Sequence, residues 1–145
     1  MAIRRADFPL PDVEDPVTAP FFAGAARGEL RIPRCARCGR FVWYPESACP
    51  GCGGETEWVA VSGRGSLFSW AVVRRPFLPA FEDKVPFVSA LVAIDEDPSV
   101  RVVSYVVDCE PESLVAGMPL AADFRPLSFA TVPGREVVVP VFRPC

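Results

Sequence analysis

Four of the six cysteines in this chain lie between residues 35 and 52, in two Cys-x-x-Cys pairs. The pairs are Cys35 with Cys38 and Cys49 with Cys52, and residues 39–48 separate them. A Cys-x-x-Cys turn directs two thiolates to one side, and two such turns supply the four corners of a tetrahedron. The spacing therefore predicts a structural Zn²⁺ site with four thiolate ligands. Two disulfide bonds, or a redox-active pair beside a helix, are the alternatives that the spacing leaves open.

The chain contains no histidine, which limits the catalytic chemistry it can perform. A Ser-His-Asp triad, a Cys-His dyad or a His-ligated metal is excluded within this polypeptide. Other acid–base groups, such as Tyr105, Cys109 and Lys84, show no catalytic spacing. Four thiolates also leave the metal no open position for water, which argues against zinc-catalysed hydrolysis. We therefore expect a chain that is not catalytic alone.

Length and charge narrow the class of protein further. With 145 residues, the chain has room for a small metal module and one compact barrel or sandwich. Its net charge of −3 disfavours non-specific binding to nucleic acid or to an anionic membrane. No apolar run is long enough to span a bilayer and the first residues do not resemble a secretory leader, so we expect a cytoplasmic protein. Because 50% of the residues are hydrophobic, we expect a partner protein to bury part of the surface.

The local patterns change at about residue 55. Residues 1–15 are charged and rich in proline, which predicts an extended arm without a core of its own. From Thr18 to Gly28, apolar side chains recur at helical spacing, and a strand leading to Cys35 follows. After Gly54 only strand-like patterns occur, separated by turn signals. These patterns lie at residues 56–62, 66–75, 87–95, 100–108, 120–127 and 137–142.

The predicted fold is therefore mainly β. It consists of a short N-terminal helix, a rubredoxin-like zinc ribbon and a five-stranded OB-fold barrel of Greek-key type. Gly63 and Gly65 would relieve crowding where a long barrel strand bends. We divide the chain into an arm at residues 1–17, the helix and ribbon at 18–55, and the barrel at 56–145.

Several stretches resemble one known family. Residues 22–38 resemble the start of its zinc ribbon, whereas residues 58–70, 117–120 and 140–144 resemble its OB-fold half. This is the family of zinc-ribbon, OB-fold proteins associated with acyl-CoA enzymes, formerly a domain of unknown function. The resemblance covers nearly all of the chain after residue 15. It implies that Cys35, Cys38, Cys49 and Cys52 are the zinc ligands, and it brings no catalytic motif.

The resemblance also implies a function. Family members are non-catalytic subunits, or C-terminal domains, that assemble with thiolase-like chains acting as acyltransferases, thiolases or retro-aldolases in steroid side-chain breakdown. We expect a hetero-oligomer with a thiolase-like partner, with two copies of each chain by analogy, and acyl-CoA as the ligand of the complex.

A second function class is a module that binds single-stranded nucleic acid. OB-folds with zinc ribbons commonly stack bases on aromatic side chains in a basic groove. Phe68, Trp70 and Phe77, near Arg74 and Arg75, fit that pattern. The alternative, that these aromatic residues fill the barrel or an interface, is favoured by the acidic total charge.

The long connection from Arg74 to Pro86 is a candidate ligand-binding loop. It carries Arg74, Arg75 and the only lysine of the chain, Lys84. Because arginine and lysine suit phosphate groups and long barrel loops often carry function, these three residues are predicted to contact the phosphates of CoA. A solvated loop is the plainer alternative.

Overall fold

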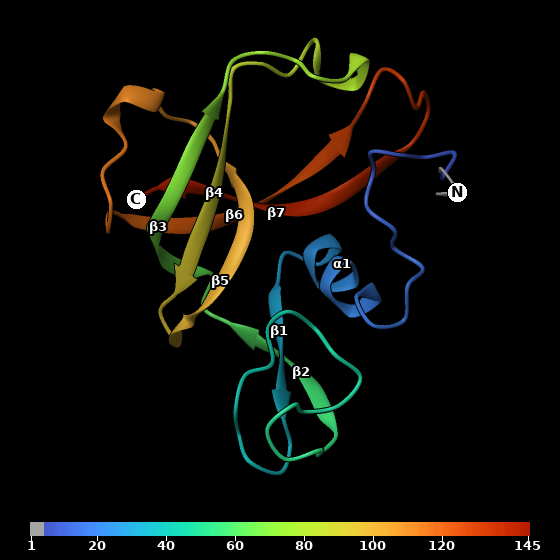
Figure 1. Cartoon of the computed structure of the whole chain (residues 1–145), viewed down its shortest axis with the longest axis vertical. Coiled ribbons are helices and arrows are strands. Elements are labelled where there is room, and N and C mark those ends of the chain that lie inside the picture. Colours follow the sequence, from blue (N-terminus) through green and yellow to red (C-terminus); the bar gives the residue numbers. More distant parts are fainter. Residues whose placement is uncertain (1–4) are drawn as a thin grey trace.

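A computed structural model of the protein describes residues 5–145, and Figure 1 shows the arrangement of its elements. The fold is mainly β, as predicted, with one short N-terminal α-helix. In chain order the elements are α1 (Ala19–Ala26), β1 (Leu30–Cys35), β2 (Thr56–Val61), β3 (Arg64–Val73), the 3-10 helix η1 (Pro79–Phe81), β4 (Phe87–Ile94), β5 (Asp97–Val106), the 3-10 helix η2 (Pro111–Ser113), β6 (Pro119–Ser128) and β7 (Glu136–Pro144).

Helix α1 forms where the apolar spacing predicts it. Thr18 occupies the N-cap position, although its side chain makes no capping hydrogen bond. Pro20 fits the first turn, where its missing N–H would have no helical partner. The chain leaves the helix through Gly28, whose φ is 75°. On the buried face Gly24 and Ala25 are enclosed, and Phe21 packs against the main core.

The zinc ribbon is built on a two-stranded antiparallel sheet. Strands β1 and β2 pair from Leu30 with Val61 to Cys35 with Thr56. The strand predicted at residues 56–62 therefore exists, but it pairs with β1 and lies outside the barrel. Alternating side chains predict a strand but not its partner, and the cysteine loops bring Thr56 back beside Cys35. The division of the chain at residue 55 stays a prediction.

The last five strands close into a barrel in the order β3-β4-β5-β7-β6. Neighbours are antiparallel except β5 and β7, which pair in parallel through Val106 and Phe142. This is the five-stranded OB-type barrel that the sequence predicts. Gly65 pairs with Ile94 on one side and Leu120 on the other. A Cβ atom there would lie 2.4 Å from the carbonyl oxygen of Ala93, so only glycine fits this crossing.

One core serves both the ribbon and the barrel. Leu30 and Ile32 of β1 join barrel residues such as Val92, Leu120 and Phe142 in a single buried cluster. No polar or charged residue among residues 5–145 is buried. The ribbon sheet is thus fixed to the barrel by shared apolar packing as well as by the chain.

The N-terminal arm is docked onto the barrel. Leu10 is 2% exposed and packs with Ala80, Phe129 and Val132 in a second buried cluster. These partners come from the β3–β4 and β6–β7 connections. Leu10 of the arm thus shares a core with the barrel connections, whereas the part of the predicted arm at residues 1–4 lies outside the described residues.

No helix within residues 5–145 has the length and apolar character needed to cross a bilayer.

Candidate metal centre

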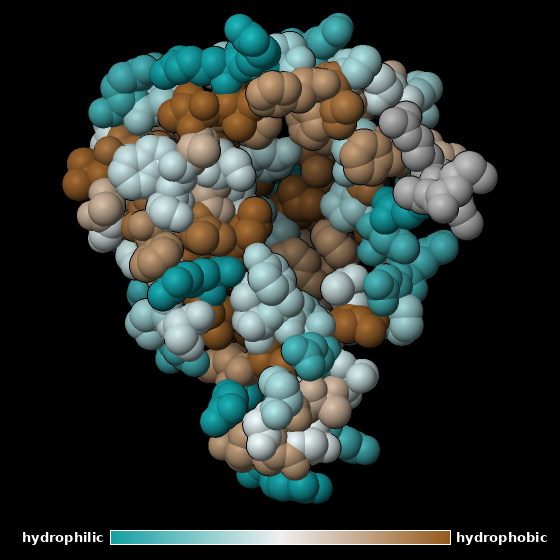
Figure 2. Space-filling view, in the orientation of Figure 1, coloured by the Kyte–Doolittle hydropathy of each residue, from teal (hydrophilic) through white to brown (hydrophobic). Residues whose placement is uncertain are grey.

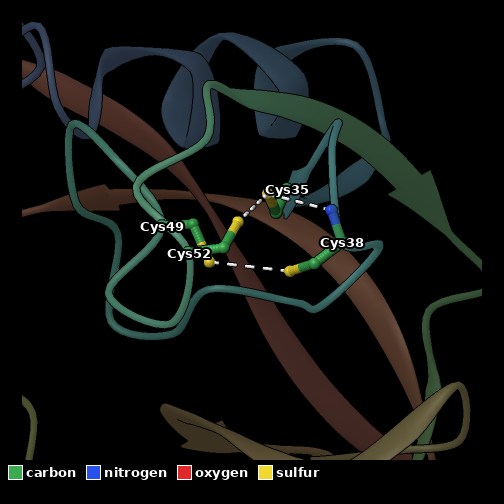
Figure 3. A group of neighbouring side chains, drawn as sticks. All are labelled: Cys35, Cys38, Cys49 and Cys52. Carbon is green, nitrogen blue, oxygen red and sulfur yellow. Dashed lines mark hydrogen bonds between the residues drawn. The ribbon is translucent and has the colours of Figure 1, made fainter.

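The four predicted ligands converge at the end of the ribbon farthest from the barrel (Figures 1 and 3). Cys35 ends β1, and Cys38, Cys49 and Cys52 lie on the two loops that connect β1 to β2. The Sγ atoms of Cys35 and Cys52 are 3.4 Å apart, and those of Cys38 and Cys49 are 3.8 Å apart. All four sulphur atoms lie within 4.8 Å of one another.

The two knuckles repeat the same backbone hydrogen bonds. In the first, Cys35 N–H donates to the carbonyl oxygen of Arg40 at 2.8 Å, and Gly39 N–H donates to that of Cys35 at 3.0 Å. In the second, the Cys49 N–H donates to the carbonyl oxygen of Gly54 at 2.9 Å. The N–H of the residue four positions after Cys49 donates to the carbonyl oxygen of Cys49 at 2.8 Å. Each loop thus holds its two thiols on one side independently of the other loop.

Gly54 closes the site from the β2 side. A Cβ atom at this position would lie 2.9 Å from Cys35 Sγ and 3.3 Å from Cys52 Sγ. It would also meet the Cβ atom of Arg37 at 3.0 Å. The residue therefore has to be glycine for the backbone to pass so close to the sulphur atoms.

Backbone amides favour the thiolate form of two ligands. The N–H groups of Cys38 and Arg37 both donate to Cys35 Sγ at 3.4 Å. With the Cys38 amide contributing most, they lower the pKa of Cys35 to about 6 against the opposing effect of burial. The pKa of Cys49 is also lowered, chiefly by the backbone N–H of Cys52. Hydrogen bonds to the charged form are the physical cause in both cases.

Cys52 shows why the cluster needs a cation. The N–H of Gly54 favours its thiolate, but the adjacent sulphur atoms, that of Cys35 first, together with burial raise the pKa of Cys52 to about 11. Closely packed thiols resist becoming thiolates together because their charges repel. A divalent cation at their centre supplies the compensating charge.

The geometry fits Zn²⁺ and not the alternatives. A Zn–S bond of about 2.3 Å places tetrahedral ligands about 3.8 Å apart, close to the observed sulphur spacings. A disulfide requires about 2.0 Å, and all six cysteines are free. Neither pair opens a helix, as a thioredoxin-like redox pair does. The four cysteines are therefore a structural zinc site, without a ligand position left for substrate.

The three predicted CoA contacts have different surroundings in the structure. Arg74 forms an ion pair of 3.1 Å with Glu112 of η2. Lys84 Nζ lies 5.3 Å from the centroid of the Phe129 ring. Arg75 is exposed. Two of the three cations therefore face different parts of the barrel rim.

The aromatic residues considered for base stacking also have different surroundings. Trp70 packs against the barrel core. The Phe68 ring is covered by the guanidinium of Arg101, at 3.8 Å from its centroid. Phe77, in contrast, is 83% exposed at the tip of the β3–β4 connection. The three rings therefore differ in burial and in the contacts they make.

The structure also contains apolar hollows that the sequence did not predict, and Figure 2 shows a hollow with hydrophobic residues inside it. One, of about 320 Å³, lies where the arm and α1 meet the barrel, and its lining includes Phe22, Val103 and Leu127. Another, of about 690 Å³, lies between the arm and η1 and includes Phe8 and Leu78. The apolar residues on both faces of β5 are the sequence signal for the first, and Pro-Phe-Leu-Pro at residues 76–79 is the signal for the second.

Comparisons with known proteins agree with this architecture. Residues 22–58 match the family model described as the rubredoxin-like zinc ribbon domain of ChsH2. Residues 58–125 match the C-terminal OB-fold domain of ChsH2. A DUF35 domain-containing scaffold protein of Methanothermobacter thermautotrophicus is 34% identical over 101 residues, which cover 68% of this chain and 74% of that protein. The chain belongs to the DUF35 family of ChsH2-type zinc-ribbon and OB-fold proteins.

Two other similar proteins give further points of reference. A probable enoyl-CoA hydratase alpha subunit of Thermomonospora curvata is 34% identical over 125 residues, or 86% of this chain, but this chain spans only about a third (36%) of that protein's length. In the solved structure named Ltp2-ChsH2(DUF35) aldolase, one chain superposes with a TM-score of 0.77 at 33% identity. The match covers 92% of this chain and 98% of that one.

Proposed function

We propose that this DUF35 protein is a non-catalytic accessory subunit that binds a thiolase-superfamily enzyme and helps form its acyl-CoA-processing complex. The observation that carries the proposal is the match to a chain of the Ltp2-ChsH2(DUF35) aldolase over 98% of that chain's length. Relatives named as an alpha subunit and as scaffold proteins support a role in an assembly.

The residues of the chain agree with a supporting role. The chain lacks histidine, and the four thiolates that would hold zinc leave no position for substrate. The metal, when bound, supplies structural stability and no acid–base chemistry. In this proposal the partner supplies the catalytic groups, for an aldolase, thiolase or acyltransferase reaction, with steroid side-chain degradation as one setting.

The β3–β4 connection is proposed to reach the acyl-CoA ligand of the complex. Arg74, Arg75 and Lys84 would contact the CoA phosphates from this connection, where Arg75 is the exposed member without a described ion pair. Arg74 would have to leave Glu112, an exchange of one exposed ion pair for another that costs little.

Affinity isolation of the tagged chain from its own source cells tests the proposal. Mass spectrometry of the co-purifying proteins should identify a thiolase-like protein in near-equal amount, and native mass spectrometry should give two copies of each chain. Recovery of the chain by itself, or with unrelated proteins, contradicts the proposal.

The nucleic-acid alternative has less support. Trp70 is partly buried against the barrel core, and Arg101 covers one face of the Phe68 ring, so both rings already have contacts within the protein. Retention on immobilised single-stranded DNA that weakens steeply as salt rises would favour this alternative.

A further inference from the structure

The most exposed large apolar side chain in residues 5–145 belongs to Phe77, which is 83% exposed. Leu78, beside it, is 39% exposed, and Phe8 across the hollow of about 690 Å³ is 57% exposed. The tip formed by Phe77 and Leu78 lies on the connection between β3 and β4, at the opposite end of the molecule from the zinc knuckles (Figure 1). Hydrophobic and hydrophilic residues lie side by side at this end in Figure 2.

The tip is held outward by ordered structure. Pro76 and Pro79 flank it and restrict its backbone. The N–H of Phe81 donates to the carbonyl oxygen of Leu78 at 3.0 Å, which closes the turn at the base of the tip. A loop without such supports would be free to fold Phe77 against the barrel.

The base of the tip is buried. Ala80 is 6% exposed and belongs to the second core cluster with Phe129 and Val132. The Phe81 ring meets the Phe129 ring edge to face, with centroids 5.3 Å apart. The fold therefore buries residue 80 and partly buries residue 81 while leaving Phe77 in solvent. A rigid exposed aromatic residue has the features of an interface anchor, because little conformational entropy remains to be lost on binding.

The charges on either side of the tip indicate the kind of surface it fits. Arg74 and Arg75 precede the tip, and Glu82 and Asp83 follow it; all four are exposed. Nucleic acid and anionic bilayers present negative charge alone. A protein can place both signs around an apolar pocket, so charge complementarity favours a protein as the occupant.

We propose that Phe77 and Leu78 anchor this chain to its partner protein by inserting into an apolar socket. The rim of the socket is positive toward Glu82 and Asp83, whereas Arg75 remains available for the CoA phosphates of the proposed complex. This inference rests on the proposed function, because it identifies where the partner of the proposed complex binds.

The experiment compares tagged wild-type chain with Phe77→Ser and Val115→Ser, each isolated from the source cells. Val115 is 64% exposed on the connection between β5 and β6, so its variant is a matched loss of an exposed apolar side chain. For the purified thiolase-like chain recovered with the wild type, Phe77→Ser should raise the Kd at least about 30-fold. Val115→Ser should leave the Kd unchanged. Because Phe77 is exposed, its variant should unfold at the same temperature as the wild type.

A photo-crosslinking residue placed at position 77 gives an independent readout. It should crosslink to the thiolase-like chain in the assembled complex, whereas the same residue at position 115 should not. Vesicles of phosphatidylcholine and phosphatidylglycerol should not retain the wild-type chain.

Four results would overturn the inference. An unchanged Kd for Phe77→Ser, with the partner still recovered, would remove the anchor and leave the proposed function standing. Recovery of the wild-type chain without a partner would remove both. A Phe77-dependent dimer of this chain would show that Phe77 binds a second copy of the chain. Phe77-dependent binding to vesicles would show that Phe77 binds a membrane.

Discussion

Cys35 Sγ lies 3.4 Å from Cys52 Sγ, so the first ligand of one knuckle meets the last ligand of the other. This contact joins the end of β1 to the loop that precedes β2. Around it the ribbon buries only a small cluster of its own, Cys35, Val42 and Cys49. The metal therefore has to supply much of the stability of this part of the chain.

Removing the metal should unfold the ribbon. Purified protein is expected to contain one zinc ion per chain by inductively coupled plasma mass spectrometry. Cys35→Ser should abolish zinc binding and lower the melting temperature sharply, because structural zinc contributes on the order of 10 kcal/mol to the free energy of folding. Cys145→Ser is the control, since Cys145 is exposed at the end of the chain. Zinc-free wild-type protein with the same melting temperature would contradict this prediction.

Gly54→Ala should weaken zinc binding without removing a ligand. The new Cβ atom would lie 2.9 Å from Cys35 Sγ, so the knuckle has to shift. Competition with a chromogenic chelator should show faster zinc release. Gly134→Ala is the control, because no atom lies within 4 Å of the added Cβ; its φ of 76°, unlike that of Gly54, is positive. Equal zinc release from both variants would show that close approach to sulphur is unimportant.

Gly65→Ala should destabilise the barrel. Its Cβ would lie 2.4 Å from the carbonyl oxygen of Ala93, where β3 crosses between two neighbouring strands. Overpacking of this kind costs about 1–3 kcal/mol. Chemical denaturation, with zinc saturating, measures the loss in free energy of unfolding. A loss below about 0.5 kcal/mol would mean that the strand moves aside without strain.

The zinc ligands and the barrel were predictable because each rests on a strong local signal. Tetrahedral coordination demands paired cysteines, and half-buried strands demand alternation. The partner of β2 was not predictable, since the alternation at residues 56–61 is the same for a ribbon or a barrel strand. Nor was the burial of Leu10, an isolated apolar residue between prolines, because its contacts come from two distant connections.

The ion pairs of Arg125 with Asp108 and Asp123 should make the stability of the folded protein depend on pH. A hydrogen bond from Arg125 is the first cause that lowers the pKa of both Asp108 and Asp123 below the usual 3.8. A lowered folded-state pKa contributes stability above the unfolded value and loses it as pH falls through the folded value. The melting-temperature difference between wild type and Arg125→Gln should therefore shrink as pH falls from 5 to about 2. A difference that stays constant over this range would contradict the role of Arg125.

The proposed CoA contacts make a kinetic prediction for the assembled complex. Replacing Arg74, Arg75 and Lys84 together with alanine should raise the KM for the acyl-CoA substrate and leave kcat nearly unchanged, because phosphates remote from the reacting carbon bind equally in ground and transition states. Arg64→Ala removes an exposed arginine at the start of β3 and should leave KM unaltered. Raising the salt concentration should narrow the KM difference between wild type and the triple variant, since exposed charges are screened. An unchanged KM in the triple variant, measured on a complex with full partner content, would show that the connection does not bind CoA phosphate.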